Sequence, residues 1–170
     1  MTSKLLVYNP TDSSLYDYAP TVKEVTYTTN RSGSAGELSF SFIQECSINM
    51  TEGAKVEFYV DGMPIFLGYV FKIKLDRWGV VSVTAYDQIR YLKAKASYSF
   101  IGKNLGGIIQ QIATDMQLQT GNLEDTGYII PTLTKENTEC LDIIEYGLQL
   151  TQYNTGKTFV FFDDFGKLSL

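Results

Sequence analysis

The stretch VSVTAYDQIRYLKAK, residues 81–95, changes its hydrophobic period halfway along, and the rest of the chain divides around it. Apolar residues occupy positions 81, 83 and 85, which is the period of two typical of a strand. Beyond Asp87, the apolar residues Ile89 and Leu92 stand three apart, as on one side of a helical turn. We therefore predict that a strand ends at Tyr86 and that a short helical stretch begins at Asp87.

The position of Asp87 suits a structural joint better than a site of chemistry. A carboxylate just before a helical turn can accept amide hydrogens from the next two or three residues. Arg90 lies three positions further on, close enough to pair with Asp87. We interpret the two residues as part of a joint between two kinds of structure.

The residues before this joint are predicted to form antiparallel β structure. GELSFSFI (36–43) and KVEFYV (55–60) alternate apolar and polar residues, and the Asp61-Gly62 pair that follows is typical of a hairpin turn. The longest strand candidate is PIFLGYVFKIKL (64–75), in which Gly68 indicates a bulge or a bend. Five or six such strands predict a small barrel or sandwich, closed to protect its edges.

The residues after the joint show helical spacing. NLGGIIQQIATDMQL (104–118) predicts one helix, capped by Asn104. TECLDIIEYGLQLT (138–151) predicts a second, capped by Asn137 or Thr138. The final stretch, KTFVFFDDFGKLSL, predicts a strand, a turn and a returning strand.

The predicted fold class is therefore α+β. An N-terminal antiparallel β-barrel, residues 1–95, is followed by a small two-helix α+β segment, residues 96–170. Because the last strand stops without a cap or a polar tail, we expect the chain to be the front part of a longer protein or a shortened form of one.

Composition excludes several classes of protein. The 170 residues carry a net charge of −5 and no run of like charges longer than two, whereas nucleic-acid binding relies on basic contacts to phosphates. No apolar stretch approaches the 18 or so residues of a membrane span. We expect neither a sequence-specific nucleic acid nor a membrane as a partner. The 12 Tyr and 10 Phe residues favour β structure.

The absence of histidine from the sequence removes most catalytic triads and the usual zinc sites. Cys46 and Cys140 lie far apart, and without a secretory signal we interpret both as reduced core residues. The sequence thus predicts no catalytic residues, no cofactor and no metal site.

Carboxylate pairs are the best enzymatic alternative, because two acids that flank a sugar can hydrolyse a glycosidic bond. The candidates are Glu124 with Asp125 and Asp163 with Asp164, which would make the protein a cell-wall (peptidoglycan) hydrolase subunit. Adjacent acids in a tight turn usually point apart into water, and local hydrogen bonding accounts for Asp in turns.

Two binding alternatives are also open. GKNLGG (102–107) opens a helix and invites comparison with a phosphate loop, but it lacks the Gly-Lys-Ser/Thr ending and suits an ordinary loop with an N-cap. A carbohydrate- or peptide-binding module would need an aromatic platform, although strand spacing favours core packing for most of its candidates. These are Tyr59, Phe66, Tyr69 and Phe71.

The order of the segments resembles the baseplate hub proteins of contractile phage tails and tail-like bacteriocins, a group that includes late control protein D. Hub proteins from prophages of Gram-positive bacteria look most similar. The resemblance rests on GELSF, IFLGYV, VSVTAYDQIRYL, IIQQIATDMQLQTGNL, ENTECLDII and TGKTFVFFDDFGKLSL, which follow the family's order over most of the chain.

The resemblance implies structural roles for particular positions. Gly68 matches the family's barrel-strand glycine, and Gly121 with Leu123 matches a turn after the first helix. The family's strand-to-helix joint is matched by Tyr86, Asp87, Tyr91 and Leu92. With Gly68 and Arg90, these residues make up the predicted structural joint.

The resemblance also implies a function without catalysis. Such proteins are expected to form a trimeric ring between the tail tube and the central spike, with two similar barrels in each subunit. They would belong to the virion or to a tail-like particle assembled in the bacterial cytoplasm.

Overall fold

The computed structural model describes residues 2–11, 13–31, 33–43 and 50–170. Its contacts divide the chain into two compact units. The first comprises Met1–Thr29 and Ala35–Asp87, and the second comprises Asn30–Ser34 and Gln88–Leu170. Cys46 lies outside the described residues, whereas Cys140 is buried as a free thiol. Among the helices of the described chain, none combines the length and the apolar character needed to cross a membrane.

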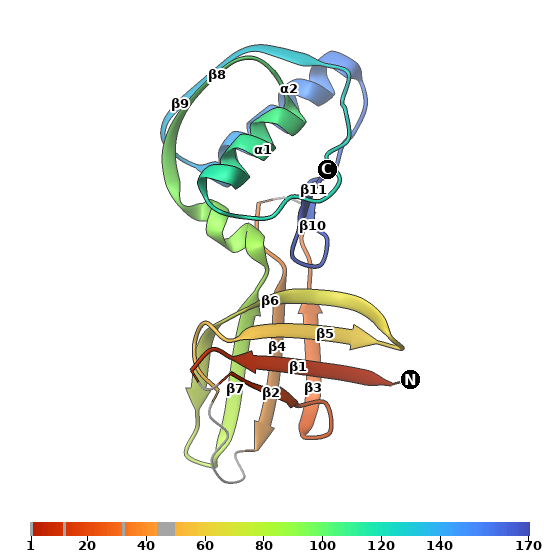
Figure 1. The fold of residues 1–170 in the computed structure, drawn as a ribbon, viewed down its shortest axis with the longest axis vertical. Coiled ribbons are helices and arrows are strands. Elements are labelled where there is room, and N and C mark those ends of the chain that lie inside the picture. Colours follow the sequence, from red (N-terminus) through yellow and green to blue (C-terminus); the bar gives the residue numbers. More distant parts are fainter. Residues whose placement is uncertain (1, 12, 32, 44–49) are drawn as a thin grey trace. The chain divides into compact units, whose positions relative to one another are not determined.

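The first unit is a seven-stranded antiparallel half-barrel (Figure 1). The strand order is β2-β1-β5-β6-β7-β4-β3, so the sheet begins at β2 and ends at β3. The strands are β1 (Ser3–Asn9), β2 (Ser14–Asp17), β3 (Val22–Thr28), β4 (Glu37–Ile43), β5 (Lys55–Val60), β6 (Met63–Leu75) and β7 (Val80–Tyr86). The α+β class is confirmed, with one or two more strands in this unit than the sequence predicted.

The sheet curls into a half-barrel because β6 changes its pairing partner along its length. Its first part pairs with β5, and its second part pairs with β7 from Tyr69 onward. A register shift lies between Val70 and Lys72. A Cβ on Gly68 would lie 2.5 Å from Cζ of Phe66, 2.7 Å from the carbonyl carbon of Tyr86 and closer still to its oxygen. The glycine therefore permits the close approach of β7, and the irregularity follows just beyond it.

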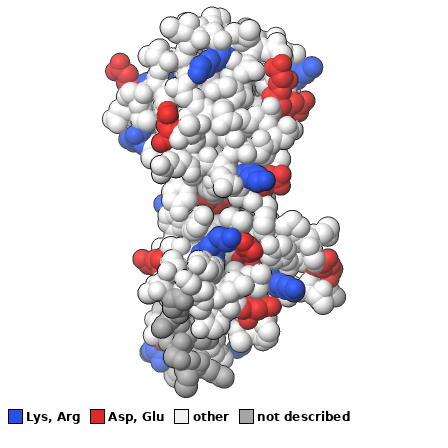
Figure 2. All heavy atoms as spheres, viewed as in Figure 1, with Lys and Arg blue, Asp and Glu red and all other residues white. Residues whose placement is uncertain are grey.

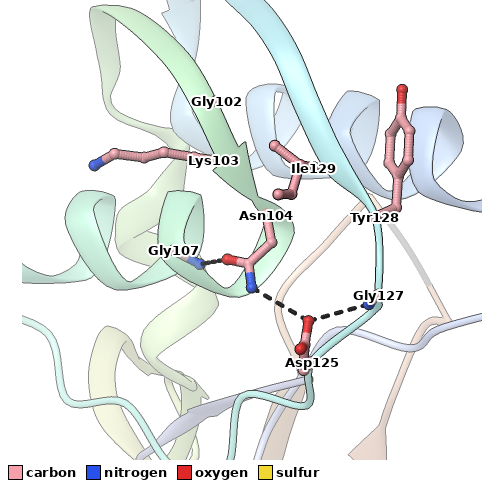
Figure 3. A pocket seen from close by; sticks show the side chains of 8 residues that line it. All are labelled: Gly102, Lys103, Asn104, Gly107, Asp125, Gly127, Tyr128 and Ile129. Carbon is pink, nitrogen blue, oxygen red and sulfur yellow. Dashed lines mark hydrogen bonds between the residues drawn. The ribbon is translucent and has the colours of Figure 1, made fainter.

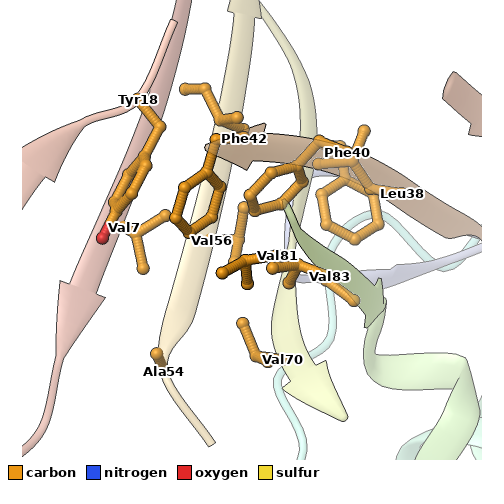
Figure 4. Close-up of a cluster of buried hydrophobic side chains, with 13 residues drawn as sticks. Val7, Tyr18, Leu38, Phe40, Phe42, Ala54, Val56, Val70, Val81 and Val83 are labelled. Carbon is orange, nitrogen blue, oxygen red and sulfur yellow. The ribbon is translucent and has the colours of Figure 1, made fainter. Parts of the chain in front are cut away.

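The core of the first unit follows the period-two pattern of its strands (Figure 4). Leu38, Phe40 and Phe42 of β4 all point inward, and the ring of Tyr18 meets that of Phe42 at 4.9 Å. These side chains pack together with the buried residues Leu5, Val7, Ala54, Val56, Phe66, Val70, Val81, Val83 and Ala85.

The second unit packs two helices against a long two-stranded ribbon (Figure 1). A 3₁₀ helix, η1 (Gln88–Lys93), begins one residue after Asp87, where the sequence predicted a helical stretch. The other elements are β8 (Lys95–Asn104), α1 (Leu105–Asp115), β9 (Ile129–Glu139), α2 (Cys140–Thr155), β10 (Phe162–Asp163) and β11 (Leu168–Ser169).

The two helix starts differ in how well the sequence predicted them. The Asn104 side chain accepts the amide hydrogen of Gly107 at 2.9 Å, so the predicted cap of α1 is confirmed. The predicted caps of α2, Asn137 or Thr138, are wrong. Strand β9 runs on through Glu139, which is the N-cap residue and makes no side-chain capping bond.

Candidate functional site

The joint after β7 is built on a reciprocal contact between Asp87 and Gly36. Asp87 Oδ2 accepts the Gly36 amide hydrogen at 2.7 Å, and the Asp87 amide donates to the Gly36 carbonyl at 3.1 Å. A Cβ on Gly36 would lie 2.7 Å from the same carboxylate oxygen. The pair continues the β4–β7 ladder by one step beyond Glu37 and Tyr86, with Asp87 buried. The contact between Asp87 and Gly36 thus stabilises the end of the β4–β7 pair.

The other predicted joint residues fall in both units. In the first, the ring of Tyr86 meets the ring of Phe71 edge-on at 5.5 Å, above the close contact with Gly68. In the second, Leu92 is fully buried, Arg90 is half-buried and Tyr91 is exposed. The pairing of Asp87 with Arg90 stays a prediction.

We expect Asp87→Ala to lower the free energy of unfolding by about 1–3 kcal/mol, because it leaves the buried Gly36 amide without this acceptor. Asp76→Ala is the control. Its carboxylate accepts two amide hydrogens, from Trp78 and Val80, but at an exposed turn where water can replace it. Urea unfolding measures both, and equal losses would contradict a special role for the buried contact.

The acidic candidates are held by the amides of their own turns. Asp125 Oδ1 accepts hydrogen bonds from the Gly127 amide at 3.0 Å and from Asn104 Nδ2 at 3.3 Å. Asp163 Oδ1 accepts the Gly166 amide hydrogen at 2.7 Å. The bonds from the Gly127 and Gly166 amides are local ones of the kind that Asp makes in turns generally, whereas the bond from Asn104 joins residues 21 apart.

The Asp163 carboxyl has a raised pKa of about 6. Burial is the largest cause and the charge of Asp164 also raises the pKa, whereas hydrogen bonds from the amides of Gly166 and Gln88 lower it. Its second oxygen, Oδ2, is buried without a hydrogen-bond partner in the described structure. Asp164, by contrast, is exposed.

The GKNLGG loop lines an open hollow of about 500 Å³ (Figure 3). Its polar groups are paired with one another. Asn104 joins Gly107 to Asp125, and Lys103 Nζ donates a hydrogen bond to Gln111 Oε1. Asp125 places a carboxylate at the hollow and Lys103 is engaged by the Gln111 amide, so this segment does not suit a phosphate. The N-cap is confirmed, but the expected loop is wrong, because Asn104 ends β8 and Leu105 begins α1.

The four aromatic candidates do not form one platform. Phe66 is only 2% exposed and belongs to the core, where its ring meets that of Tyr27 at 5.5 Å. Tyr69 and Phe71 stand at odd positions of the same strand and are half-buried. The Tyr59 hydroxyl donates to Glu57 at 2.9 Å. Strand spacing had already favoured core packing for Phe66.

Charges on the face drawn in Figure 2 are interspersed, with acidic and basic residues of both units side by side with neutral ones. A nucleic-acid interface would require a stripe of basic residues. This face offers none among the residues that the structure describes.

The sequence analysis did not identify the structural roles of two residues, Gly36 and Gln88. Gly36 was predicted only as the first residue of the GELSFSFI stretch, although it is a partner of Asp87 from 51 residues away. Gln88 is buried, donates to the Gly166 carbonyl and accepts the Gln119 amide hydrogen at 3.3 Å. A buried glutamine that joins two distant turns leaves no local signal in the sequence.

The fold matches about one half of several solved tail proteins, two of which come from prophages. The 43 kDa tail protein of prophage MuSo2 from Shewanella oneidensis superposes with a TM-score of 0.74 at 12% identity, over 98% of this chain and 52% of that one. The tail protein from Neisseria meningitidis MC58 gives 0.75 at 10% identity, over 99% and 50%. Prophage tail protein gp18 from Listeria monocytogenes EGD-e gives 0.59 at 14% identity, over 98% and 49%. The half-barrel with its α+β unit is thus a fold of phage tail proteins.

The sequence relationship is more specific. The YQBQ-like family model matches residues 25–170, and the chain belongs to that family. The Bacillus subtilis (strain 168) protein YqbQ is 34% identical over 125 residues, and the phage-like element PBSX protein XkdQ of the same strain is 34% identical over 124. Each match covers 72% of this chain and 38% of the relative, so the chain spans well under half of their length.

Proposed function

We propose that this protein is a structural component of the tail of a phage or of a phage-like particle. The observation that carries the proposal is the agreement of nearly the whole chain, both units included, with about half of each of three tail proteins, two of them from prophages. The family relationship to a protein of the phage-like element PBSX supports the same role. The protein would act through its surfaces and without catalysis.

The finer proposal is the central hub of the baseplate, which joins the tail tube to the spike. The segments quoted from the sequence follow the order of hub proteins, and a stiff half-barrel provides strands and loops that can pack against identical neighbours. The protein would be found in the virion or in a tail-like particle that assembles in the bacterial cytoplasm, and its partners would be the tube and spike proteins.

Oligomeric state tests the hub role. A full-length protein of the family is expected to be a trimer by light scattering. An antibody raised against that protein is expected to label one end of purified particles in electron micrographs. Monomers at high concentration, or particles that lack the protein, would refute the proposal.

One observation favours the hydrolase alternative, because a carboxyl with a pKa raised to about 6 is what a general acid requires. A zymogram of cell-wall material separates the two. We expect no lysis, whereas lysis that disappears on Asp163→Ala or Glu124→Ala would replace the structural role with an enzymatic one.

A further inference from the structure

Strand β11 lies in the middle of a small sheet at the end of the second unit. On one side it pairs antiparallel with β10, Phe162 opposite Ser169 and Asp163 opposite Leu168. On the other side it runs parallel to residues 119–124. Leu168 and Leu170 donate to the carbonyls of Gln119 and Asn122, both at 2.9 Å. The amides of Gly121 and Glu124 return hydrogen bonds to the carbonyls of Leu168 and Leu170.

The segment just before β10 has the character of a strand without a partner. The side chains of Phe159 and Phe161 face inward, Phe161 being 7% exposed, while Thr158 and Val160 face outward, Val160 being 44% exposed. This is the alternation from which the sequence predicted a longer strand. Yet no backbone hydrogen bond joins these four residues to another segment of the described chain. Extended backbone beside a paired strand is an open edge that another strand can join.

The register of the hairpin fixes where a partner would lie. Asp164 and Lys167 exchange both backbone hydrogen bonds across the turn, at 2.7 and 3.2 Å. Such exchanges recur at every second pair of an antiparallel ladder. The next pair that exchanges both hydrogen bonds is therefore Phe162 with Ser169. If the chain continued in the same register, the following pairs would be Val160 with the first residue after Leu170 and Thr158 with the third residue after Leu170. The amides of Phe159 and Phe161 point to the other side.

We propose that Thr158–Phe161 is a docking edge for an extended polypeptide strand, antiparallel to it, and that the occupant is the segment following Leu170 in a full-length protein of this family. Strand β11 already delivers the chain to this edge in the required direction and register. Full-length relatives hold much more polypeptide than the part matched here.

The surroundings of the edge set the character of the incoming strand. The second residue after Leu170 falls opposite Phe159, on the inward face that Leu168 and Leu170 share, so an apolar side chain is expected there. A hollow of about 240 Å³ lies between α2 and Thr158–Phe161 and leaves space for it.

Amide hydrogen exchange tests the proposal on three proteins. The first is the 170-residue chain, the second carries Thr-Val-Thr-Val after Leu170, and the matched control carries Pro-Val-Pro-Val. Proline at the first and third added positions cannot donate and is excluded from central strands. With Thr-Val-Thr-Val, the amides of Thr158 and Val160 are expected to exchange at least tenfold more slowly, while those of Phe159 and Phe161 do not change.

Each other outcome overturns the proposal. Unchanged exchange at Thr158 and Val160 would show that the edge takes no strand in this register, and equal protection by the proline extension would show that pairing is not the cause. Protection at Phe159 and Phe161 would place the strand on the wrong side. Protection that falls on dilution would make the occupant a second copy. None of these results bears on the proposed tail function, which does not depend on this edge.

Discussion

Replacing Gly68 with alanine is expected to lower the free energy of unfolding of the half-barrel by about 3 kcal/mol or more. The added Cβ would lie 2.5 Å from Cζ of Phe66 and 2.7 Å from the carbonyl carbon of Tyr86. A side chain in the core can turn away, but the Tyr86 carbonyl belongs to the backbone of β7 at the Tyr69–Tyr86 pair. Overpacking of cores typically costs 1–3 kcal/mol, and here the strand itself must move.

Gly106→Ala is the matched control for this change. Gly106 is also buried, but a Cβ there would meet its nearest neighbour, Cβ of Leu123, at 3.5 Å, an ordinary van der Waals contact. Because Gly106 lies in α1, alanine should stabilise the chain by up to about 1 kcal/mol. Thermal and urea unfolding of the two variants should therefore shift in opposite directions. A Gly68→Ala protein as stable as the parent would show that β6 and β7 can separate without cost.

The parts of the fold that the sequence predicted are those whose inward residues keep one period throughout. The buried residues of β4, of the first part of β6 and of β7 alternate without interruption, and each segment is a strand. The helical spacing of α1 and α2 was equally regular.

The ribbon of β8 and β9 broke this rule, and the sequence did not predict it. The inward residues of β9, Ile130 and Leu133, stand three apart. On β8, Gly102 adopts a left-handed backbone conformation between two paired positions, which disturbs the alternation there. A strand whose buried residues lack a period of two cannot be distinguished from a loop by pattern alone. The same strand runs on to Glu139, which is why the expected caps of α2 failed.

The site shows the same division between local and long-range information. The sequence predicted the junction at Asp87 because the spacing of apolar residues changes from that of a strand to that of a helical turn within a few residues. The contact of Asp87 with Gly36 was not predicted, because Gly36 lies just before β4 and contributes only backbone atoms and the absence of a side chain. A sequence indicates where a strand gives way to a helix more readily than it indicates which distant backbone atoms that junction contacts.

Lowering the pH from 7 to 5 is expected to stabilise the parent relative to an Asp163→Asn variant by about 1.4 kcal/mol. Burial raises the pKa of the Asp163 carboxyl to about 6 in the folded chain, from an ordinary value of 3.8. The folded state therefore binds this proton more tightly than the unfolded state does. The contribution to stability is fully present below pH 3.8 and is lost as the pH rises through 6, up to about 3 kcal/mol in all.

Asparagine removes this titration but keeps an oxygen that can accept the Gly166 amide hydrogen, so the turn should survive the change. Asp164→Asn is the control, because Asp164 is the exposed neighbour in the same turn and its replacement leaves the Asp163 carboxyl to titrate. Urea unfolding at pH 7, 6 and 5 should give the parent and Asp164→Asn similar slopes and Asp163→Asn a different one. The Asp164→Asn profile should lie at slightly lower pH than that of the parent, because the charge of Asp164 raises the pKa of Asp163. Three parallel profiles would mean that the Asp163 carboxyl reaches water in the folded chain. In that case the raised pKa of Asp163, and with it the only argument for its use as a general acid, would be lost.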